Sequence, residues 1–361
     1  LTAIFWLYQK HLVGNDSTIS EWLINYQGGF TKRGIIGEIC FRIADYFDLK
    51  LRFVIFLFQS IICFTYTVLL YIFIKDVPRN MLTVIAIFSP IFLLYPLGEI
   101  EVLARKETFL FIGFVIFLFL ADSNKKTLTS LIYVFLFFPI LFLIWEPLVF
   151  FMPFIIFILF VQMKDQPLKL KILKISICIS SSFFTAIYII MNPLPPEQHI
   201  VMSNELMNKF GEVCYMSCDL LKTKSSIEEQ FVAVFQKFTF VAFFRYFLIM
   251  LIGFLPLMIL TYNSSFKKNK LFLNRFKSLF IPFLIILIIP ILLFTAMTDW
   301  GRVVNIIYTF SIFTYLFLLK NDLITLDQRV VYFDNLYKFK KRLFVILFYI
   351  FAFGWNPKTQ I

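Results

Sequence analysis

The chain has few of the groups on which common catalytic chemistries depend. It contains only two histidines, His11 and His199, and its five cysteines do not follow a metal-site spacing. It has no P-loop, HExxH, GxSxG or CxxC motif. These absences argue against a protein-held metal centre, a P-loop nucleotide hydrolase, a serine hydrolase and a dithiol redox enzyme. No cofactor and no metal ion are expected.

Charge is also scarce, since only 16% of the residues are charged while 60% are hydrophobic and 20% aromatic. A soluble domain carries about a quarter charged residues. Continuous apolar runs recur, many near the length of about 18 residues that crosses a bilayer. The sequence therefore predicts an all-α protein, a polytopic transmembrane helical bundle forming one transmembrane domain over 1–361. About eleven spans are expected, at 1–13, 51–74, 81–97, 108–121, 128–144, 147–162, 172–191, 240–262, 278–298, 303–319 and 342–354.

The formal net charge of +12 is unevenly distributed. Lysine and arginine are concentrated in alternate connections, at 75–80, 122–127, 163–171, 263–277 and 320–341. The positive-inside rule places these loops in the cytoplasm, with the N-terminus cytoplasmic and the C-terminus extracytoplasmic. The basic excess is then a signal of topology, so the lipid bilayer is an expected partner and nucleic acid is not.

The first outer loop, 14–50, is expected to hold an amphipathic helix at the membrane interface. Apolar residues recur at helical spacing from Gly34 to Phe47. Gly28 and Gly29 predict a turn in which the backbone comes close to a ligand. Thr31 is a candidate N-cap of the following helix.

The long loop 192–239 predicts an extracytoplasmic cap with helices near 203–213 and 226–237. Cys214 and Cys218 lie in this loop. An oxidising compartment favours a disulfide between them, whereas an i,i+4 pair on a regular helix is poorly placed to form one. The sequence leaves this pairing open.

Five cations adjoin expected spans on the outer side: Lys32, Arg33, Arg105, Lys106 and Arg302. Charges at membrane depth are costly and usually face a cavity or a partner. Because arginine binds phosphate through paired hydrogen bonds, the set is a candidate phosphate or diphosphate site. The alternative is that each cation pairs with a nearby acid: Lys32 and Arg33 with Glu38, Arg105 and Lys106 with Glu101 or Glu107, and Arg302 with Asp299.

Three acids are candidate catalytic groups that would deprotonate or orient a hydroxyl: Glu146, Glu99 and Asp299. Glu146 stands between Trp145 and Pro147, where a solvated surface charge is hard to explain. A salt-bridged or solvated loop carboxylate is the alternative for the others. Further acids on the outer side are Asp16, Glu21, Glu38 and Glu101.

Three short motifs carry a resemblance to known proteins: Gly-Gly-Phe-Thr-Lys-Arg-Gly-Ile-Ile-Gly from Gly28, Ala-Arg-Lys-Glu from Ala104 and Asp-Trp-Gly-Arg from Asp299. The chain resembles multi-pass proteins of bacterial surface-polysaccharide clusters, which are similar to Wzy-type glycan polymerases and GT-C glycosyltransferases. The resemblance implies glycosyl transfer from a polyprenyl-linked glycan, a partner carrying a phosphate or diphosphate, on the outer face of the inner (plasma) membrane. It implies that Arg33, Arg105 and Arg302 match the outer-face arginines of the polymerases.

The sequence departs from the paired-acid motif of GT-C enzymes in the first outer loop. Only Asp16, Glu21 and Glu38 are available there, which argues against a metal-dependent mechanism. Two alternatives stay open: a transporter or flippase of lipid-linked or anionic solutes, and a non-catalytic scaffold of an envelope complex. A transporter should carry charges through the middle of its spans, and this chain has few there.

Overall fold

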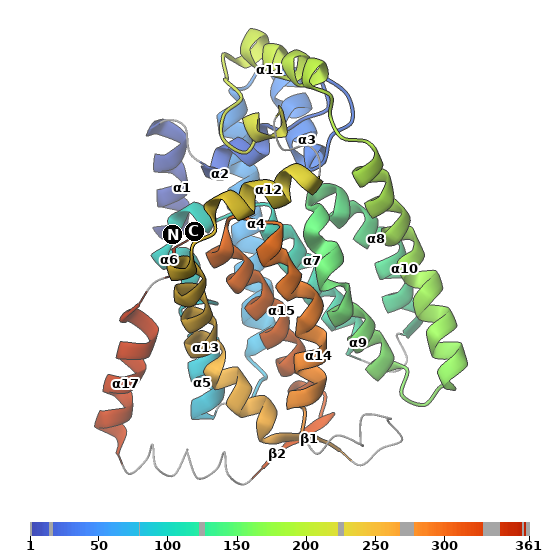
Figure 1. Ribbon diagram of the computed structural model, residues 1–361, viewed down its shortest axis with the longest axis vertical. Helices are drawn as coiled ribbons and strands as arrows, with labels where there is room; N and C mark the ends of the chain where they lie inside the picture. Colours follow the sequence, from blue (N-terminus) through green and yellow to red (C-terminus); the bar gives the residue numbers. More distant parts are fainter. Residues whose placement is uncertain are drawn as a thin grey trace.

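The protein is built almost wholly of α-helices, as a computed structural model shows (Figure 1). The structure describes residues 2–13, 17–78, 80–122, 127–222, 227–267, 278–327, 340–355 and 357–358. Five helices in these ranges are long and apolar enough to cross a membrane: α4 (Leu51–Ile74), α8 (Thr127–Ile144), α10 (Leu168–Met191), α13 (Phe240–Tyr262) and α15 (Trp300–Lys320). The chain is therefore a helical membrane protein.

Eleven membrane spans, the number expected from the sequence, are not supported. The other six segments form shorter helices: α1 (Thr2–Val13), α5 (Met81–Ile87), α7 (Glu107–Ala121), α9 (Met152–Gln162), α14 (Phe280–Ile291) and α17 (Lys341–Phe353). At 1.5 Å per residue even α7 rises only about 23 Å, less than the roughly 30 Å of a hydrocarbon core. Apolar composition revealed these segments but not where each helix ends.

The segment 81–97 shows why an apolar run does not always form one span. Its helix α5 ends at Ile87, and Pro90, which has no backbone N–H, follows in an irregular turn. Asn305 from α15 donates its side-chain N–H to the carbonyl of Ile91 at 2.9 Å. The chain then forms one short turn, α6 (Tyr95–Gly98), so the break is stabilised by a neighbouring helix.

Helix α15 is the centre of the bundle. Its residues are buried almost from end to end, whereas in the other four long helices no more than 33% of the most apolar stretch is buried. Several of its polar residues form hydrogen bonds within the bundle: Tyr308 donates its hydroxyl to the carbonyl of Ala86 at 2.8 Å, and Thr309 donates its hydroxyl to the carbonyl of Asn305 at 2.8 Å. The outward apolar surface of the other helices is then available to lipid.

Short helices gather at one end of the bundle, here called the cap end (Figure 1). They are α2 (Ser17–Ser20), η1 (Glu21–Leu23), α3 (Gly34–Tyr46), α11 (Pro196–Phe210), η5 (Asp219–Lys222) and α12 (Ile227–Lys237). The helix expected from Gly34 is present as α3, which packs against α4 and η1. Its buried face runs through Ile36, Cys40 and Ala44, and Ile39 from the expected apolar stripe is exposed.

The cap also answers the open question about the cysteines, because Cys214 and Cys218 form a disulfide. They lie between α11 and η5 in an irregular stretch, with Cα atoms 5.3 Å apart. The objection from regular helix geometry therefore does not apply. The expected helix at 203–213 begins earlier, at Pro196, and ends at Phe210 before Gly211 in the left-handed conformation. The expected helix at 226–237 is α12.

The opposite end carries a two-stranded antiparallel ribbon, β1 (Ser264–Phe266) with β2 (Ile324–Leu326), in the register Ser265 opposite Thr325. This ribbon was not expected in an all-α chain.

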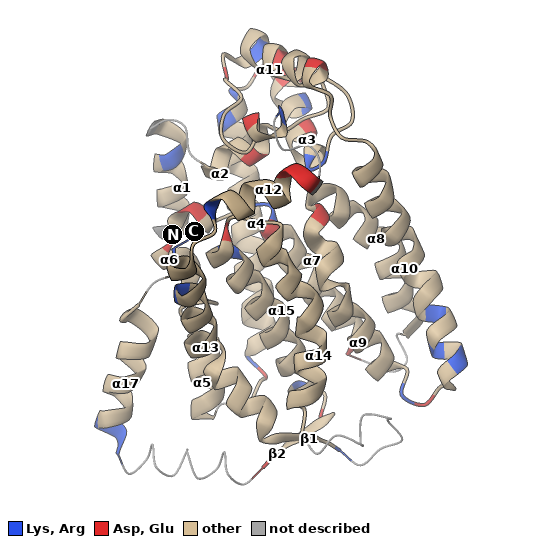
Figure 2. Ribbon diagram, in the orientation of Figure 1, with Lys and Arg blue, Asp and Glu red and all other residues tan. Residues whose placement is uncertain are grey.

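The described basic residues of α10 lie toward this end (Figure 2). Much of the Lys- and Arg-rich sequence used for the orientation, at 79, 123–126, 268–277 and 328–339, lies outside the described residues. The orientation of the termini stays an expectation.

Candidate functional site

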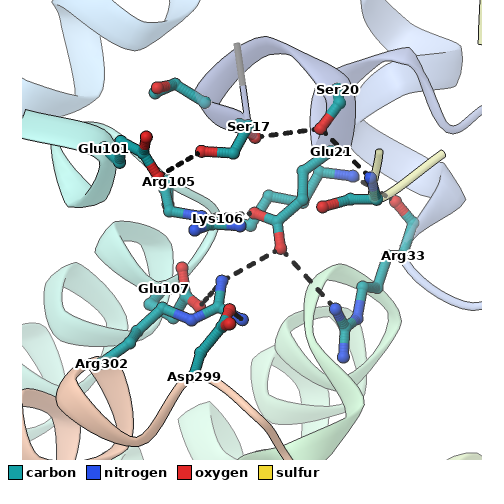
Figure 3. Close-up of polar contacts among 12 residues, drawn as sticks. Ser17, Ser20, Glu21, Arg33, Glu101, Arg105, Lys106, Glu107, Asp299 and Arg302 are labelled. Atoms are coloured by element: carbon teal, nitrogen blue, oxygen red, sulfur yellow. Dashed lines mark hydrogen bonds and ion pairs between the residues drawn. The ribbon is translucent and has the colours of Figure 1, made fainter. Parts of the chain in front are cut away.

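Four segments that are distant in sequence meet at the cap end of α15 (Figure 3). They are η1, the turn before α3, the turn before α7 and the start of α15. These segments bring together Glu21, Arg33, the triplet Arg105–Glu107 and the pair Asp299 and Arg302. The site is thus a buried network of opposite charges.

Glu21 is the centre of this network, and its side chain is 1% exposed. Its carboxylate lies 3.2 Å from Arg105 Nε, 3.2 Å from an Arg302 terminal nitrogen and 3.6 Å from an Arg33 terminal nitrogen. Burial alone raises the pKa of a carboxyl group, but Arg105, Arg302 and Arg33 together hold the pKa of Glu21 well below its usual range. Glu21 is therefore a permanent anion that draws three guanidinium groups to one point.

Arg33 also forms a two-pronged pair with Glu146, which begins η4 (Glu146–Phe151). Arg33 Nε and Nη2 each donate to a different oxygen of Glu146 at 2.8 Å. Burial opposes the charge of Glu146, but Arg33 holds the pKa of this carboxyl group below its usual value. The backbone of Arg33 is left-handed, with φ 64°, which is uncommon for a residue with a side chain. The expected N-cap Thr31 does not cap α3; Arg33 holds that position.

Arg302 has three acidic neighbours. One terminal nitrogen lies 2.9 Å from Glu107, and the other lies 2.7 Å from Asp299, three residues earlier in the sequence. The same side chain also reaches Glu21. Its Nε is nevertheless buried with no hydrogen-bond partner in the described part of the chain. One donor of this guanidinium is thus left for an acceptor that the described residues do not supply.

The two lysines of the predicted set occupy different positions. Lys106 is fully buried and donates its ammonium to the backbone carbonyl of Arg33. Burial lowers the pKa of Lys106 to about 8, although Glu21 favours its charged form. Burial also lowers the pKa of Lys32, with Glu146 acting in the opposite direction. Both lysines are therefore closer to losing a proton than exposed lysines are.

A cavity of about 750 Å³ opens beside the network. Such a volume lies in the range of small-molecule sites. Six of the eight predicted site residues line it: Lys32, Arg33, Arg105, Arg302, Glu99 and Asp299. Lys106 and Glu146 do not line it, and they contact the wall residue Arg33 from behind.

The alternative expectation, that nearby acids neutralise the cations, holds for some partners only. Arg302 pairs with Asp299 as that alternative requires. Arg33 pairs with Glu146 instead of Glu38, and Arg105 pairs with Glu21 instead of Glu101 or Glu107. Glu38 accepts hydrogen bonds from Gln27, the Tyr26 backbone and Arg42, while Glu101 accepts one from Ser17. Asp16 lies outside the described residues.

In the segment 14–50, Gly29 has the positive φ of 121° that the expected turn requires, and Gly28 and Gly37 serve packing within the protein. The approach of a ligand to this turn stays an expectation. A Cβ at Gly28 would collide with the backbone oxygen of Gln198 in α11. A Cβ at Gly37 would collide with the backbone oxygen of Ile24. These glycines let α11 and α3 lie close to the loop that holds Arg33.

Sequence reasoning underestimated Glu21, which was one of several outer-side acids without an assigned role. Nothing local distinguishes it, because its partners lie 12, 84 and 281 positions further along the chain. Further parts of the cavity wall come from η5 and α12, including Asp219, Gln230 and Lys237. No short motif marks these residues.

One group in the described residues has ligand atoms close enough to hold a metal ion: His199, Cys214 and Cys218. Both sulfur atoms are engaged in the disulfide, and His199 Nε2 lies 3.1 Å from the carbonyl of Cys218. Because thiolates are the metal ligands of cysteine, the oxidised pair does not offer a metal site.

Comparisons with protein-family models, with curated proteins and with solved structures give no match to this chain. A class of protein is therefore defined by the fold alone: a helical membrane protein with a buried charge network beside a cavity.

Proposed function

We propose that the cavity binds the phosphate or diphosphate of a lipid-linked sugar donor, and that the protein is a membrane glycosyltransferase or polymerase of cell-surface polysaccharide assembly. The observation that carries the proposal is the convergence of Arg33, Arg105 and Arg302 on one cavity wall. Three guanidinium groups from separate segments form an arrangement suited to an anion with several oxygens.

Paired arginines can still bind an anion, since a guanidinium has five N–H donors. The Arg33 pair with Glu146 uses Nε and one terminal nitrogen, and Arg302 Nε has no described partner. The carboxylates hold the guanidinium planes in fixed orientations before a ligand arrives. Such preorganised donors stabilise charge that develops on a leaving group.

In the proposed reaction the bond between the sugar C1 and the donor phosphate oxygen breaks, and the acceptor hydroxyl oxygen forms a bond to C1. The proton of that hydroxyl passes to Glu99 or Asp299, which line the cavity. The polyprenyl phosphate or diphosphate leaves toward Arg33, Arg105 and Arg302, aided by Lys32. For Glu146 a positioning role is proposed instead of the role of a general base, because Glu146 lies behind the cavity wall and holds Arg33.

All walls of this cavity come from the cap end and from the adjoining helix starts. In the proposed orientation this end faces the extracytoplasmic side of a bacterial inner membrane, where lipid-linked glycans are polymerised. A site confined to one end favours an enzyme over a transporter or flippase, whose pathway must reach both sides.

The test is a binding and transfer assay on the purified protein in lipid nanodiscs. A polyprenyl diphosphate and inorganic diphosphate are titrated against the parent chain, Arg33→Lys and Arg105→Lys. Lysine keeps the charge that Glu21 and Glu146 require but cannot form the two-pronged bond. We expect diphosphate affinity to fall about tenfold, as the loss of one charge-assisted hydrogen bond implies.

The matched control is Arg42→Lys on α3, whose side chain is two-thirds exposed and pairs with Glu38 away from the cavity. The control should bind as the parent does. Equal affinity in Arg33→Lys, Arg105→Lys and the control would show that the arginines do not bind the anion. Loss of diphosphate binding without loss of surface glycan in cells would separate the cavity from glycosyl transfer.

A further inference from the structure

Helix α12 forms part of the cavity wall and has three chemically different sides. Gln230, Ala233, Val234 and Lys237 line the cavity, at the spacing of one helix face. Successive residues are about 100° apart around a helix, so Phe231, Val232 and Phe235 fall on another side. All three of these apolar side chains are exposed, Phe235 to 70%. Glu228, in the first turn of α12, falls on the same side as these three apolar residues, while the polar residues Glu229 and Gln236 fall between the two sides.

The exposed apolar side of α12 continues into the surface of a membrane-spanning helix. Thr239 caps the N-terminus of α13 by accepting a hydrogen bond from the Ala242 backbone N–H, so only a two-residue link separates the two helices. Phe238 in this link is exposed, and Phe240 and Val241 at the start of α13 are exposed to 75% and 77%. The apolar surface is therefore continuous from α12 to the span.

The orientation of α12 agrees with a position at a membrane surface. Figure 1 shows α12 lying crosswise to α13 and α15, across the cap end of the bundle. The two ends of α12 carry charge, with Glu228 and Glu229 in the first turn and Lys237 in the last (Figure 2). A helix that lies in the interface has its axis in the membrane plane, an apolar side in lipid and a polar side in water.

We propose that the Phe231–Val232–Phe235 side of α12 is inserted into the lipid headgroup region, so that this helix separates the charged cavity from the bilayer. The partner is the lipid bilayer, chosen because the α12 surface is continuous with that of a span. The cavity then lies at headgroup depth, beside the hydrocarbon that would hold the tail of a lipid-linked anion. The lipid contact does not depend on the proposed reaction, but it explains how such a substrate would reach the arginines.

The experiment uses a nitroxide spin label at Phe235→Cys, with Gln236→Cys as the matched control on the polar side. Both are placed in a Cys63→Ala background, because the other free cysteines, Cys40 and Cys178, are buried. The full chain is reconstituted in nanodiscs containing anionic phospholipid. The rate at which the spin label collides with a paramagnetic reagent is measured for two reagents. Oxygen concentrates in hydrocarbon, and a neutral nickel chelate stays in water.

We expect the label at 235 to collide at least threefold more often with oxygen than the label at 236, and the nickel chelate to show the reverse order. Equal chelate access at both positions would overturn the proposal, because α12 would then lie in water. Shielding of position 235 from both reagents would also overturn it, since a protein partner or a second copy would cover the helix. Inorganic diphosphate binding is measured on the same samples, so failure of the proposed function and failure of the lipid contact are told apart.

Discussion

Replacing Glu21 by glutamine should lower stability and raise anion affinity at the same time. Glutamine keeps the shape of the side chain but removes the negative charge that three arginines share. The network around it then holds more positive than negative charge in a site where Glu21, Arg105 and Arg302 are all buried. Removing one partner of a buried ion pair costs about 3–5 kcal/mol, because the remaining charge is left uncompensated.

Anion affinity should move in the opposite direction. A unit charge roughly 8 Å from the ligand contributes about 1–2 kcal/mol at an effective dielectric constant of about 20–40. Loss of the Glu21 charge should therefore tighten the binding of sulfate or inorganic diphosphate by at least about tenfold, because each of these anions carries more than one negative charge. A substitution that merely disordered the site would weaken binding instead.

The assay combines thermal unfolding in detergent with calorimetric titration of sulfate below the melting range. The control is Asp45→Asn, which breaks the exposed pair between Asp45 and Lys209. Exposed pairs contribute about 0.2–1 kcal/mol, so this variant should change little. The reasoning is refuted if Glu21→Gln is no less stable than Asp45→Asn, or if its sulfate affinity falls along with its stability.

Three further predictions concern pH, the disulfide and the glycine contacts. Burial lowers the pKa of Lys106 to about 8 from 10.5, so Lys106 loses its positive charge and sulfate affinity should fall as the pH rises through 8. The variant Lys106→Met should abolish this pH dependence. The buried charge of Lys106 destabilises the folded state fully below pH 8, and this destabilisation should disappear between about pH 8 and 10.5. Cys214→Ser with Cys218→Ser should lower the free energy of unfolding by about 2 kcal/mol, the entropy of closing a short loop, and a reducing agent should then no longer affect the melting temperature. Gly37→Ala should cost about 1–3 kcal/mol by overpacking and should be worse than Gly113→Ala, because Gly37 faces backbone whereas Gly113 faces the flexible side chain of Leu141.

The sequence predicted helices well and membrane spans less well. The apolar runs at 51–74 and 240–262 coincide with α4 and α13. In an apolar run of this length, a continuous helix satisfies the backbone hydrogen-bonding groups within the segment. The run at 81–97 does not form a span, since its break depends on Asn305 from the far side of the bundle. Composition cannot report such a partner, so the broken run at 81–97 was counted as a span too readily.

For the candidate site as well, the sequence identified individual residues better than it identified their contacts. Charged residues next to apolar runs were recognisable one by one, because a charge in such a place is costly without a partner. Among the ion pairs only the one between Arg302 and Asp299, three residues apart, was expected, whereas the pairing of Arg33 with the distant Glu146 was not. The disulfide stayed open for the same reason, since it depends on whether residues 214–218 are helical.

Ion pairing and anion binding were treated as alternatives at the level of sequence, but the geometry makes them compatible. Glu21 and Glu146 together occupy only part of the hydrogen-bonding capacity of Arg33, Arg105 and Arg302. Without these carboxylates, three guanidinium groups would repel one another and separate. With them, the guanidinium groups stay together beside a cavity, where the proposed phosphate would bind the remaining donors without first gathering them. The acids that neutralise the site therefore also assemble it, which is why removing Glu21 is expected to separate stability from affinity.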